Sequence, residues 1–232
     1  MRYLTCLIAV TPVLSVAETI TFYSPEIPGL ISKNDNGKVV NKAAVEFVHI
    51  IASRSGITDN YQVVPFVQAF ESAQNMKATC ALGIGRDKST EEKFKWVGPV
   101  VRQKILLYAN KSDRRVIHNL EDARKMTIGV RKKTVVASML REAGFLLDES
   151  DDELINLKKL TTHKIDLWAA NAIPALAAVK ELGVSEPRLI TSLGVTDGYV
   201  ACNPQVSDET IEKLNLVIRS MAKTGELSKS GL

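Results

Sequence analysis

Residues that mark metal and catalytic sites are scarce in this 232-residue sequence. It has three histidines, and His49, His118 and His163 lie far apart, without the spacing of metal ligands. No Gly-x-Ser-x-Gly or His-Glu-x-x-His motif occurs, and Gly83-Ile84-Gly85 lacks the third glycine of a dinucleotide-binding fingerprint. The sequence therefore predicts no metal and no cofactor, and it favours a protein that is not an enzyme.

Long runs of charge and of apolar residues are also missing. The net charge is +4, and no run of five like charges occurs, so nothing points to nucleic acid or to an anionic membrane surface. No segment after residue 17 is apolar enough to cross a bilayer. With 45% hydrophobic and 24% charged residues the composition is ordinary for a globular protein. The length allows one large domain or two small lobes.

The N-terminus has the order of a secretory signal peptide. Met1-Arg2 supplies a positive charge, residues 3–16 are mainly apolar, and Ser15-Val16-Ala17 is a small-x-small cleavage site before Glu18. The apolar stretch is shorter than the roughly 20 residues that span a bilayer. A core strand and an uncleaved anchor are the alternatives, although Pro12 argues against a regular helix there. We expect residues 1–17 to be removed and the mature chain to be periplasmic.

Cysteine is nearly absent from the predicted mature chain. Once Cys6 leaves with the signal peptide, Cys80 and Cys202 remain. In an oxidising compartment these two could form a disulfide. Two small buried thiols are the alternative, and the residues alone leave both open.

Strands and helices alternate along the first part of the mature chain. Strands are expected at residues 19–23, 61–65 and 78–84, and helices at 44–55 and 66–74. This β-α-β-α-β order is typical of an α/β unit with a parallel sheet.

The same alternation then begins again. Its expected elements are strands at 104–108, 127–130 and 165–169, helices at 120–125, 134–143 and 174–182, and a mixed segment at 154–160. A last strand at 198–202 leads into a helix that Ser207 caps and Gly225 ends. No flexible linker separates the two α/β units, so we expect two lobes joined by strands.

Six segments together resemble family 3 of the bacterial extracellular solute-binding proteins, the amino-acid-binding type of periplasmic protein. They occur in the family's order over about 200 residues of the chain. They are Asp35-Asn36-Gly37-Lys38, residues 85–99 ending in Trp96-Val97-Gly98-Pro99, residues 119–123, Ile128-Gly129-Val130 leading to Thr134, residues 164–168, and Tyr199-Val200-Ala201.

The resemblance implies an α/β, two-lobed periplasmic-binding-protein-like fold of type II with two hinge crossovers. Lobe one would be residues 18–103 with 199–232, and lobe two residues 104–198. The crossovers would lie near 103–107 and 196–199, and the ligand would sit between lobes that close by a hinge motion. In such folds the return strand lies beside the third strand of lobe one, which would bring Cys202 near Cys80 and favours the disulfide.

The family's charged ligand-binding residues are absent from their expected places. Thr90 stands where amino-acid binders of this family carry the arginine that binds the carboxylate. Asn171 stands where they carry the acid that binds the ammonium. We interpret both differences as arguing against an ordinary L-α-amino acid. Arg86 could face the cleft instead; the alternative is a surface arginine paired with Asp87 or Glu91.

Thr134 matches the family's serine or threonine at the start of the first full helix of lobe two. Its hydroxyl and the helix N-terminus would form a corner that favours anions. Arg131, Lys132 and Lys133 add positive charge to it, and Lys133 replaces a glycine usual in the family. A plain helix cap is the alternative role for Thr134.

Four more residues complete the expected ligand-binding set. Tyr23 and Glu26 would lie at the mouth of the cleft, where Tyr23 could stack on a ligand and Glu26 could bind a cation. Phe66 and Trp168 would wall the pocket. For all three aromatic residues, plain packing is the alternative.

These observations predict a monomeric periplasmic protein that captures a small-molecule ligand for an ABC-type transporter. Ligand would shift the lobes toward a closed form that a membrane permease or receptor recognises. A periplasmic ligand sensor for a signalling receptor is one alternative, and a dehydratase-like enzyme on the same fold is another.

Overall fold

The computed structural model describes residues 18–27, 31, 39 and 43–229. The predicted signal peptide and the turn at residues 35–38 lie outside this part of the chain. Within it, strands and helices alternate as β1 (Thr19–Pro25), α1 (Ala43–Arg54), β2 (Thr58–Val64), α2 (Phe66–Asn75), β3 (Thr79–Gly85), β4 (Lys95–Ala109), β5 (Ile128–Arg131), α3 (Val135–Glu142), β6 (Leu147–Ser150), α4 (Glu153–Thr161), β7 (Leu167–Asn171), α5 (Ala172–Leu182), β8 (Arg188–Cys202) and α6 (Asp208–Thr224).

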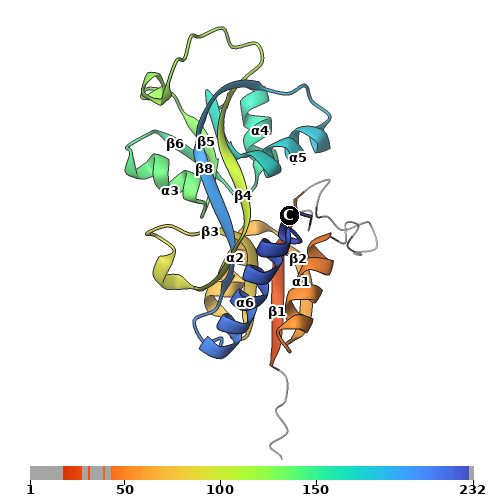
Figure 1. Ribbon diagram of the computed structural model, residues 1–232. Helices are drawn as coiled ribbons and strands as arrows, with labels where there is room; N and C mark the ends of the chain where they lie inside the picture. The colour runs from red at the N-terminus through yellow and green to blue at the C-terminus, as the bar shows by residue number, and fades with distance from the viewer. Residues whose placement is uncertain (1–17, 28–30, 32–38, 40–42, 230–232) are drawn as a thin grey trace, which may run out of the picture.

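The strands form one continuous sheet in the order β2-β1-β3-β8-β4-β7-β5-β6. Strands β1, β2 and β3 are parallel, as are β5, β6 and β7, while β8 is antiparallel to β3 and β4 is antiparallel to β7. Figure 1 shows two lobes that only β4 and β8 join. Lobe one contains β1–β3 with α1, α2 and α6, and lobe two contains β5–β7 with α3–α5. The predicted α/β, two-lobed fold is thereby confirmed.

Each lobe has its own hydrophobic core. In lobe one Phe22 and Phe47 pack with Leu214 of α6, and in lobe two Leu107 packs with Leu140 of α3. Along β4 the apolar side chains belong to the first core as far as Val101 and to the second from Ile105 on. The chain therefore passes between the lobes within residues 101–105, and β8 returns within residues 193–200. The exact lobe limits stay a prediction.

Helix ends follow from local hydrogen bonding. The Ser207 hydroxyl accepts from the backbone N–H of Thr210 at the start of α6, and Gly225 ends this helix in the left-handed conformation. Between these caps Leu214, Ile218 and Met221 form the buried stripe that attaches α6 to lobe one. The stripe and both caps agree with the sequence prediction.

Several elements differ from the prediction. Strand β4 begins at Lys95 rather than at 104, and the helix expected at 120–125 is a short 3-10 helix over Leu120–Ala123. The segment expected to be mixed is helix α4, in which the buried polar residues Glu153 and Asn156 interrupt the apolar period. Strand β6 was not predicted, and three of its four residues are half-buried at the sheet edge. Strand β8 begins at Arg188 rather than at 198, because β4 pairs with it through both lobes.

Cys80 and Cys202 form a disulfide. They stand directly opposite each other in the antiparallel pair of β3 and β8, and both side chains are fully buried in the core of lobe one. The disulfide ties the C-terminal return strand to lobe one, beyond the point where the chain leaves lobe two.

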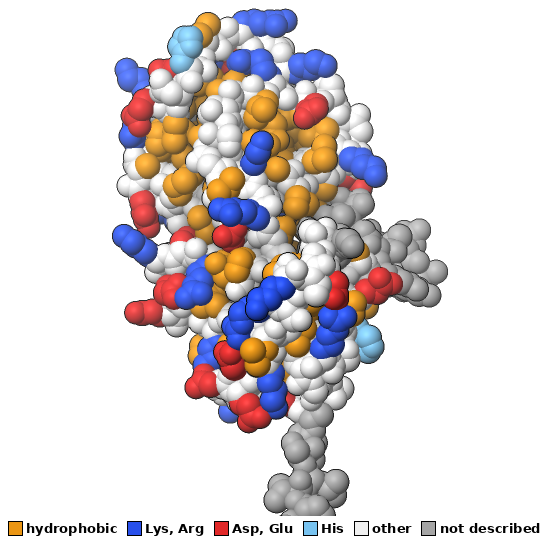
Figure 2. All heavy atoms as spheres, viewed as in Figure 1, with side chains coloured by type: hydrophobic (Ala, Val, Ile, Leu, Met, Phe, Trp, Pro, Cys, Tyr) orange, Lys and Arg blue, Asp and Glu red, His pale blue; other side chains and the backbone are white. Residues whose placement is uncertain are grey.

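The surface carries charges of both signs on both lobes, while hydrophobic side chains gather over β4 and β8 of lobe two on the face seen in Figure 2. Leu189 and Val195 of β8 are more than half exposed. Among the described residues, no helix combines the length and apolar character that a membrane span needs.

Candidate functional site

Arg131 is the central residue of the space between the lobes. It ends β5, and it lines three adjoining cavities that we name by position. The inner cavity is lined by residues that include Ser24, Leu82, Val100, Gln103, Asn171 and Ile173. The hinge cavity is lined by residues that include Gly85, Gln103, Thr134, Asn171 and Asp197. The mouth cavity has a volume of about 490 Å³ and is lined by residues that include Glu26, Phe66, Asp152, Glu153 and Glu181. Residues of both lobes line each cavity.

The Arg131 side chain is almost completely buried, with 8% of its surface exposed. Its guanidinium carbon lies 3.9 Å from the centroid of the Phe66 ring. Phe66 begins α2 in lobe one, so this cation–π contact joins the lobes. Gly85 helps the lobes approach, because a Cβ at this position would stand 2.4 Å from Val135 at the start of α3.

Glu153 supplies the opposite charge beneath Arg131. Its Oε1 lies 3.8 Å from Arg131 Nε, while its Oε2 accepts hydrogen bonds from Trp168 Nε1 at 2.8 Å and from Asn156 Nδ2 at 3.3 Å. Burial raises the pKa of Glu153 above its usual range and lowers the pKa of Arg131, and the attraction between the two charges opposes both effects. Glu153 is held from one side, which leaves its second oxygen facing the guanidinium.

Two buried polar atoms in the cleft have no partner. Among the described residues, neither Arg131 Nε nor Asn171 Oδ1 makes a hydrogen bond. Buried polar groups are nearly always paired, so such atoms call for an explanation. An arginine offers five N–H donors in a planar fork, whereas an asparagine Oδ1 is an acceptor. The cleft can therefore bind an anion at one point and a hydrogen-bond donor at another.

Neither a protein-family model nor a curated protein sequence matches the chain. Solved structures do match over almost its whole length. A histidine kinase sensor domain with similarity to periplasmic binding proteins has a TM-score of 0.81 at 16% identity, covering 92% of this chain and 94% of the other. An amino acid ABC transporter substrate-binding protein from Streptococcus pneumoniae, bound to L-arginine, has a TM-score of 0.75 at 19% identity, covering 91% and 92%.

An ancestral amino-acid-binding protein, a precursor of cyclohexadienyl dehydratase, has a TM-score of 0.74 at 13% identity, covering 91% of this chain and 93% of the other. The chain has the periplasmic-binding-protein fold. The similar structures are mostly binding proteins, and they are consistent with the fold of solute-binding protein family 3.

Five of the nine residues predicted to bind ligand line the cleft of this periplasmic-binding-protein fold. They are Glu26, Phe66, Arg131, Thr134 and Asn171. Glu26 is exposed at the mouth. Thr134 caps α3, since its Oγ1 accepts from the N–H of Ala137 at 3.2 Å and donates to the Arg131 carbonyl at 2.7 Å. Contact of any of the five with a ligand stays a prediction.

Arg86 and Thr90 do not line these cavities. The Arg86 guanidinium donates to both carboxylate oxygens of Glu91, at 2.7 and 2.6 Å, so the alternative of a paired surface arginine describes it. Thr90 is buried, and its hydroxyl donates to the Gly85 carbonyl at 3.1 Å and accepts from the N–H of Asp87 at 2.9 Å. Its role here is to fix the loop after β3.

Tyr23 and Trp168 are core residues in this fold rather than cleft residues. Tyr23 packs in lobe one with Phe66 and Phe70, and 7% of it is exposed. Trp168 is fully buried between Tyr108 and α4, so it cannot wall the pocket. Trp168 affects the cleft only through its hydrogen bond to Glu153.

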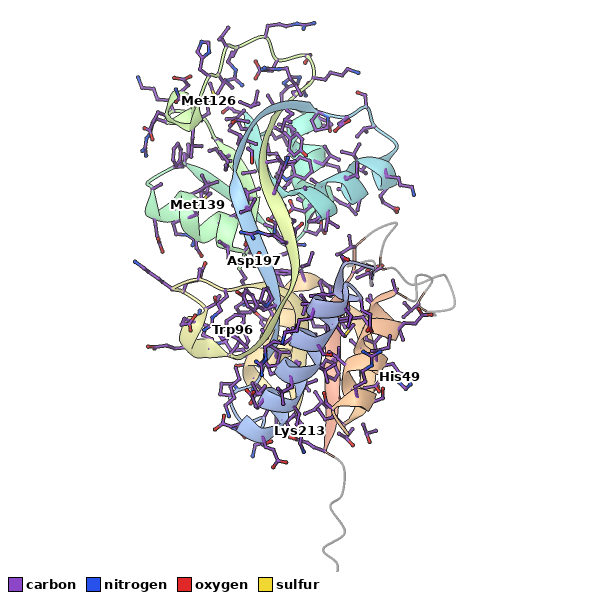
Figure 3. All side chains as sticks on the ribbon, in the orientation of Figure 1. His49, Trp96, Met126, Met139, Asp197 and Lys213 are labelled. Carbon is purple, nitrogen blue, oxygen red and sulfur yellow. A yellow bond between two sulfur atoms is a disulfide. The ribbon has the colours of Figure 1, made fainter. Side chains whose placement is uncertain are left out.

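The sequence prediction missed most of the residues that line the cleft, and three of them are polar residues at its centre. Gln103 lies where β4 passes between the lobes, and its Oε1 accepts from the N–H of Ile173 at 3.3 Å. Asp197 of β8, which lies between the lobes in Figure 3, also lines the hinge cavity; it stands opposite Arg102 and pairs with it at 3.4 Å. Glu153 is the third. Polar residues on strands that join two apolar cores were the available signal for Gln103 and Asp197.

No histidine lines the three cavities. His49 lies on the outer side of α1 in Figure 3, where its Nδ1 is 3.2 Å from Asp59. Within the part of the chain that the structure describes, no group of three histidine, cysteine or acidic residues is arranged to hold a metal ion.

Lys133 forms a second contact between the lobes. Its Nζ lies 2.6 Å from Glu71 of α2, and its backbone has φ of +60°. The turn thus has the left-handed conformation that suits glycine, although lysine occupies it. The ion pair is partly exposed, which limits its contribution to about 0.2–1 kcal/mol.

Lys133→Gly should therefore weaken ligand binding by about 1.4-fold to 5-fold, because the contact between the lobes loses its ion pair. It should also raise the free energy of unfolding, since relief of the left-handed conformation, roughly 1–2 kcal/mol for a non-glycine residue, outweighs the loss of the partly exposed ion pair. Titration calorimetry and urea denaturation measure the two effects. Glu71→Gln is the matched control, with the same loss of affinity and no gain in stability. A Glu71→Gln variant that binds like the wild type would contradict this assignment.

Proposed function

We propose that this chain is an exported, monomeric periplasmic binding protein that captures a small solute between its lobes for an ABC-type transporter. The observation that carries the proposal is Arg131, a buried cation of lobe two that lines the inner, hinge and mouth cavities between the lobes and lies against Phe66 of lobe one. A solute bound to Arg131 would touch both lobes at once. It would then favour the closed form through its higher affinity for that form.

The proposed transport role draws on the sequence and on the solved structures together. The predicted signal peptide supports export, and the substrate-binding protein of an amino acid ABC transporter shares the fold. A membrane permease would be the partner that recognises the closed form. Thr90 and Asn171, at the family's positions for the charged residues that bind a zwitterion, favour a solute other than a standard L-α-amino acid.

A thermal-shift screen of small metabolites, with the exported protein, tests the proposal. A true ligand at a concentration of 100 times its Kd should add about 2.7 kcal/mol to the free energy of unfolding. The same compound should reduce the radius of gyration in X-ray scattering, because the lobes close. Ligands that stabilise the protein without compaction would count against capture between the lobes. Strong stabilisation by the standard L-amino acids would overturn the interpretation of Thr90 and Asn171.

A ligand sensor is the second candidate function. The observation that favours it is the similarity to a histidine kinase sensor domain over 92% of this chain. Transport and sensing use the same closure of the lobes, so the membrane partner distinguishes them. Binding of the ligand-bound form alone to a purified permease would support transport, and binding of that form alone to a purified receptor would support sensing. A dehydratase-like enzyme is a third reading, and turnover of the bound compound in the same assay would reveal it.

A further inference from the structure

We propose that the cleft binds a small hydroxycarboxylate, with its carboxylate on Arg131 and its hydroxyl on Asn171. The inference rests on the proposed function, which requires a solute between the lobes, and it names the chemical class of that solute. Its basis is the pair of buried polar atoms that the described residues leave without a hydrogen bond.

The guanidinium of Arg131 is built to receive an anion. It makes no hydrogen bond with any described residue, and its ion-pair distance of 3.8 Å to Glu153 is too long for one. Glu153 therefore leaves the five donors of the fork free for another acceptor, and Nε is buried without one. A ligand carboxylate can take two of them in a bidentate pair. Trp168 and Asn156 fix Glu153 beneath the guanidinium, where its charge lies close to Arg131 without a hydrogen bond to it.

A cationic ligand is the alternative that the acidic mouth cavity suggests. Its carboxylates, however, are already bound or exposed to water. Asp151 pairs with Lys132 at 3.1 Å, Asp152 accepts from the α4 backbone at 2.8 Å, and Glu26 and Glu181 are exposed. Arg131, in contrast, is buried. The group that needs a partner in this cleft is the cation.

Asn171 decides between a hydroxyl and an ammonium on the ligand. Its Oδ1 is buried and accepts no hydrogen bond from the described residues. A neutral amide can accept from a hydroxyl at little cost, but it cannot compensate the charge of a desolvated ammonium. Asp197, the nearby acid of the hinge cavity, is paired with Arg102. Apolar side chains such as Ile27, Leu82 and Ile173 line the inner cavity, of about 70 Å³, which suits a short hydrocarbon group.

The test compares matched compounds on the whole exported protein by titration calorimetry. Lactate and 2-hydroxyisovalerate are the carboxylate probes. L-alanine and L-valine replace the hydroxyl by ammonium, and lactamide and 2-hydroxyisovaleramide remove the negative charge. We expect binding of at least one hydroxycarboxylate. Its amide should bind at least about 30-fold more weakly, the fold-change for a buried charged pair that loses one partner. Its amino acid should also bind more weakly, because the neutral amide of Asn171 does not compensate a desolvated ammonium.

Variants then assign the two contacts. Arg131→Met should weaken hydroxycarboxylate binding by at least about 30-fold, and Arg131→Met/Glu153→Gln, which buries no unpaired charge, gives the same comparison if the single variant does not fold. Glu153→Gln should strengthen binding by about 10-fold, because it removes a like charge near the ligand anion. Asn171→Asp should shift preference toward the matched amino acid.

Failure of this inference differs from failure of the proposed function. If neither hydroxycarboxylate binds, if the amino acids bind as well as the acids, or if Glu153→Gln weakens binding as a cationic ligand requires, the inference is overturned. If another metabolite still binds and compacts the wild-type protein, the proposed function stands although the hydroxycarboxylate inference fails. If no compound in either screen binds, both are wrong.

Discussion

Removal of the Cys80–Cys202 disulfide should lower the free energy of unfolding by about 2–5 kcal/mol. The two cysteines are separated by 122 positions in the sequence, and the chain between them includes all of lobe two. A crosslink that closes so long a loop removes much conformational entropy from the unfolded chain. The variant Cys80→Ala/Cys202→Ala suits the measurement, since both side chains are fully buried and alanine leaves no unpaired polar group.

Urea denaturation measures the effect, with a reductant as the control. Wild-type protein unfolded and refolded with dithiothreitol should have the same lowered midpoint as the double variant. The variant itself should not respond to dithiothreitol. Equal midpoints for oxidised and reduced wild-type protein would contradict a stabilising disulfide.

Replacement of the buried charge pair by Arg131→Met/Glu153→Gln should raise the free energy of unfolding by about 1–4 kcal/mol while ligand binding is lost. Both groups lose hydration on burial, and their attraction seldom repays that cost, so apolar or neutral substitutes are often more stable. The directions of both pKa shifts agree, since burial disfavours each charged form. A double variant with a lower free energy of unfolding than the wild type would contradict this prediction.

The pH dependence of the stability of the single variant Arg131→Met shows the effect of the Glu153 charge on its own. Without Arg131, the pKa of Glu153 should rise further, because the only opposing attraction from a positive charge is gone. The free energy of unfolding of the Arg131→Met variant should then be highest below the ordinary pKa of glutamate. It should fall as the pH rises toward the elevated pKa of Glu153 in the folded protein. Urea denaturation at about pH 5 and about pH 8 shows this slope, which the double variant should lack.

The fold could be predicted largely from the sequence because each lobe repeats a strong local pattern. Apolar runs such as residues 78–84 correspond to strands buried in the middle of the sheet, and Ser207 and Gly225 gave the limits of α6. The pattern failed where burial does not follow hydrophobicity. Helix α4 buries Glu153 and Asn156, and β8 has several exposed side chains before residue 198.

The site was harder to predict because the alternation of side chains along a strand does not show which face of the strand borders the cleft. Trp168 is close in sequence to Asn171 but points into the core, while Asn171 at the end of β7 reaches the cleft. Arg86 was expected to face the ligand, yet Glu91 lies close enough to bind it. The basic run at residues 131–133 includes Arg131, which lines the three cavities between the lobes. The burial of Arg131 depends on Phe66 and Glu153, which come from two other elements.

The strands that join the lobes form a ribbon whose hydrogen bonding limits the mechanics of the molecule. Strands β4 and β8 pair with each other from Lys95 opposite Cys202 to Ala109 opposite Arg188. Their register is regular from Val101 to Ile105 and shifts on either side of that stretch. A ladder of this kind resists sliding of one strand along the other, whereas irregular pairing permits bending and twisting. Lobe two should therefore rotate more easily than it translates. The proposed ligand on Arg131 would act at a distance from the ribbon about which this rotation takes place.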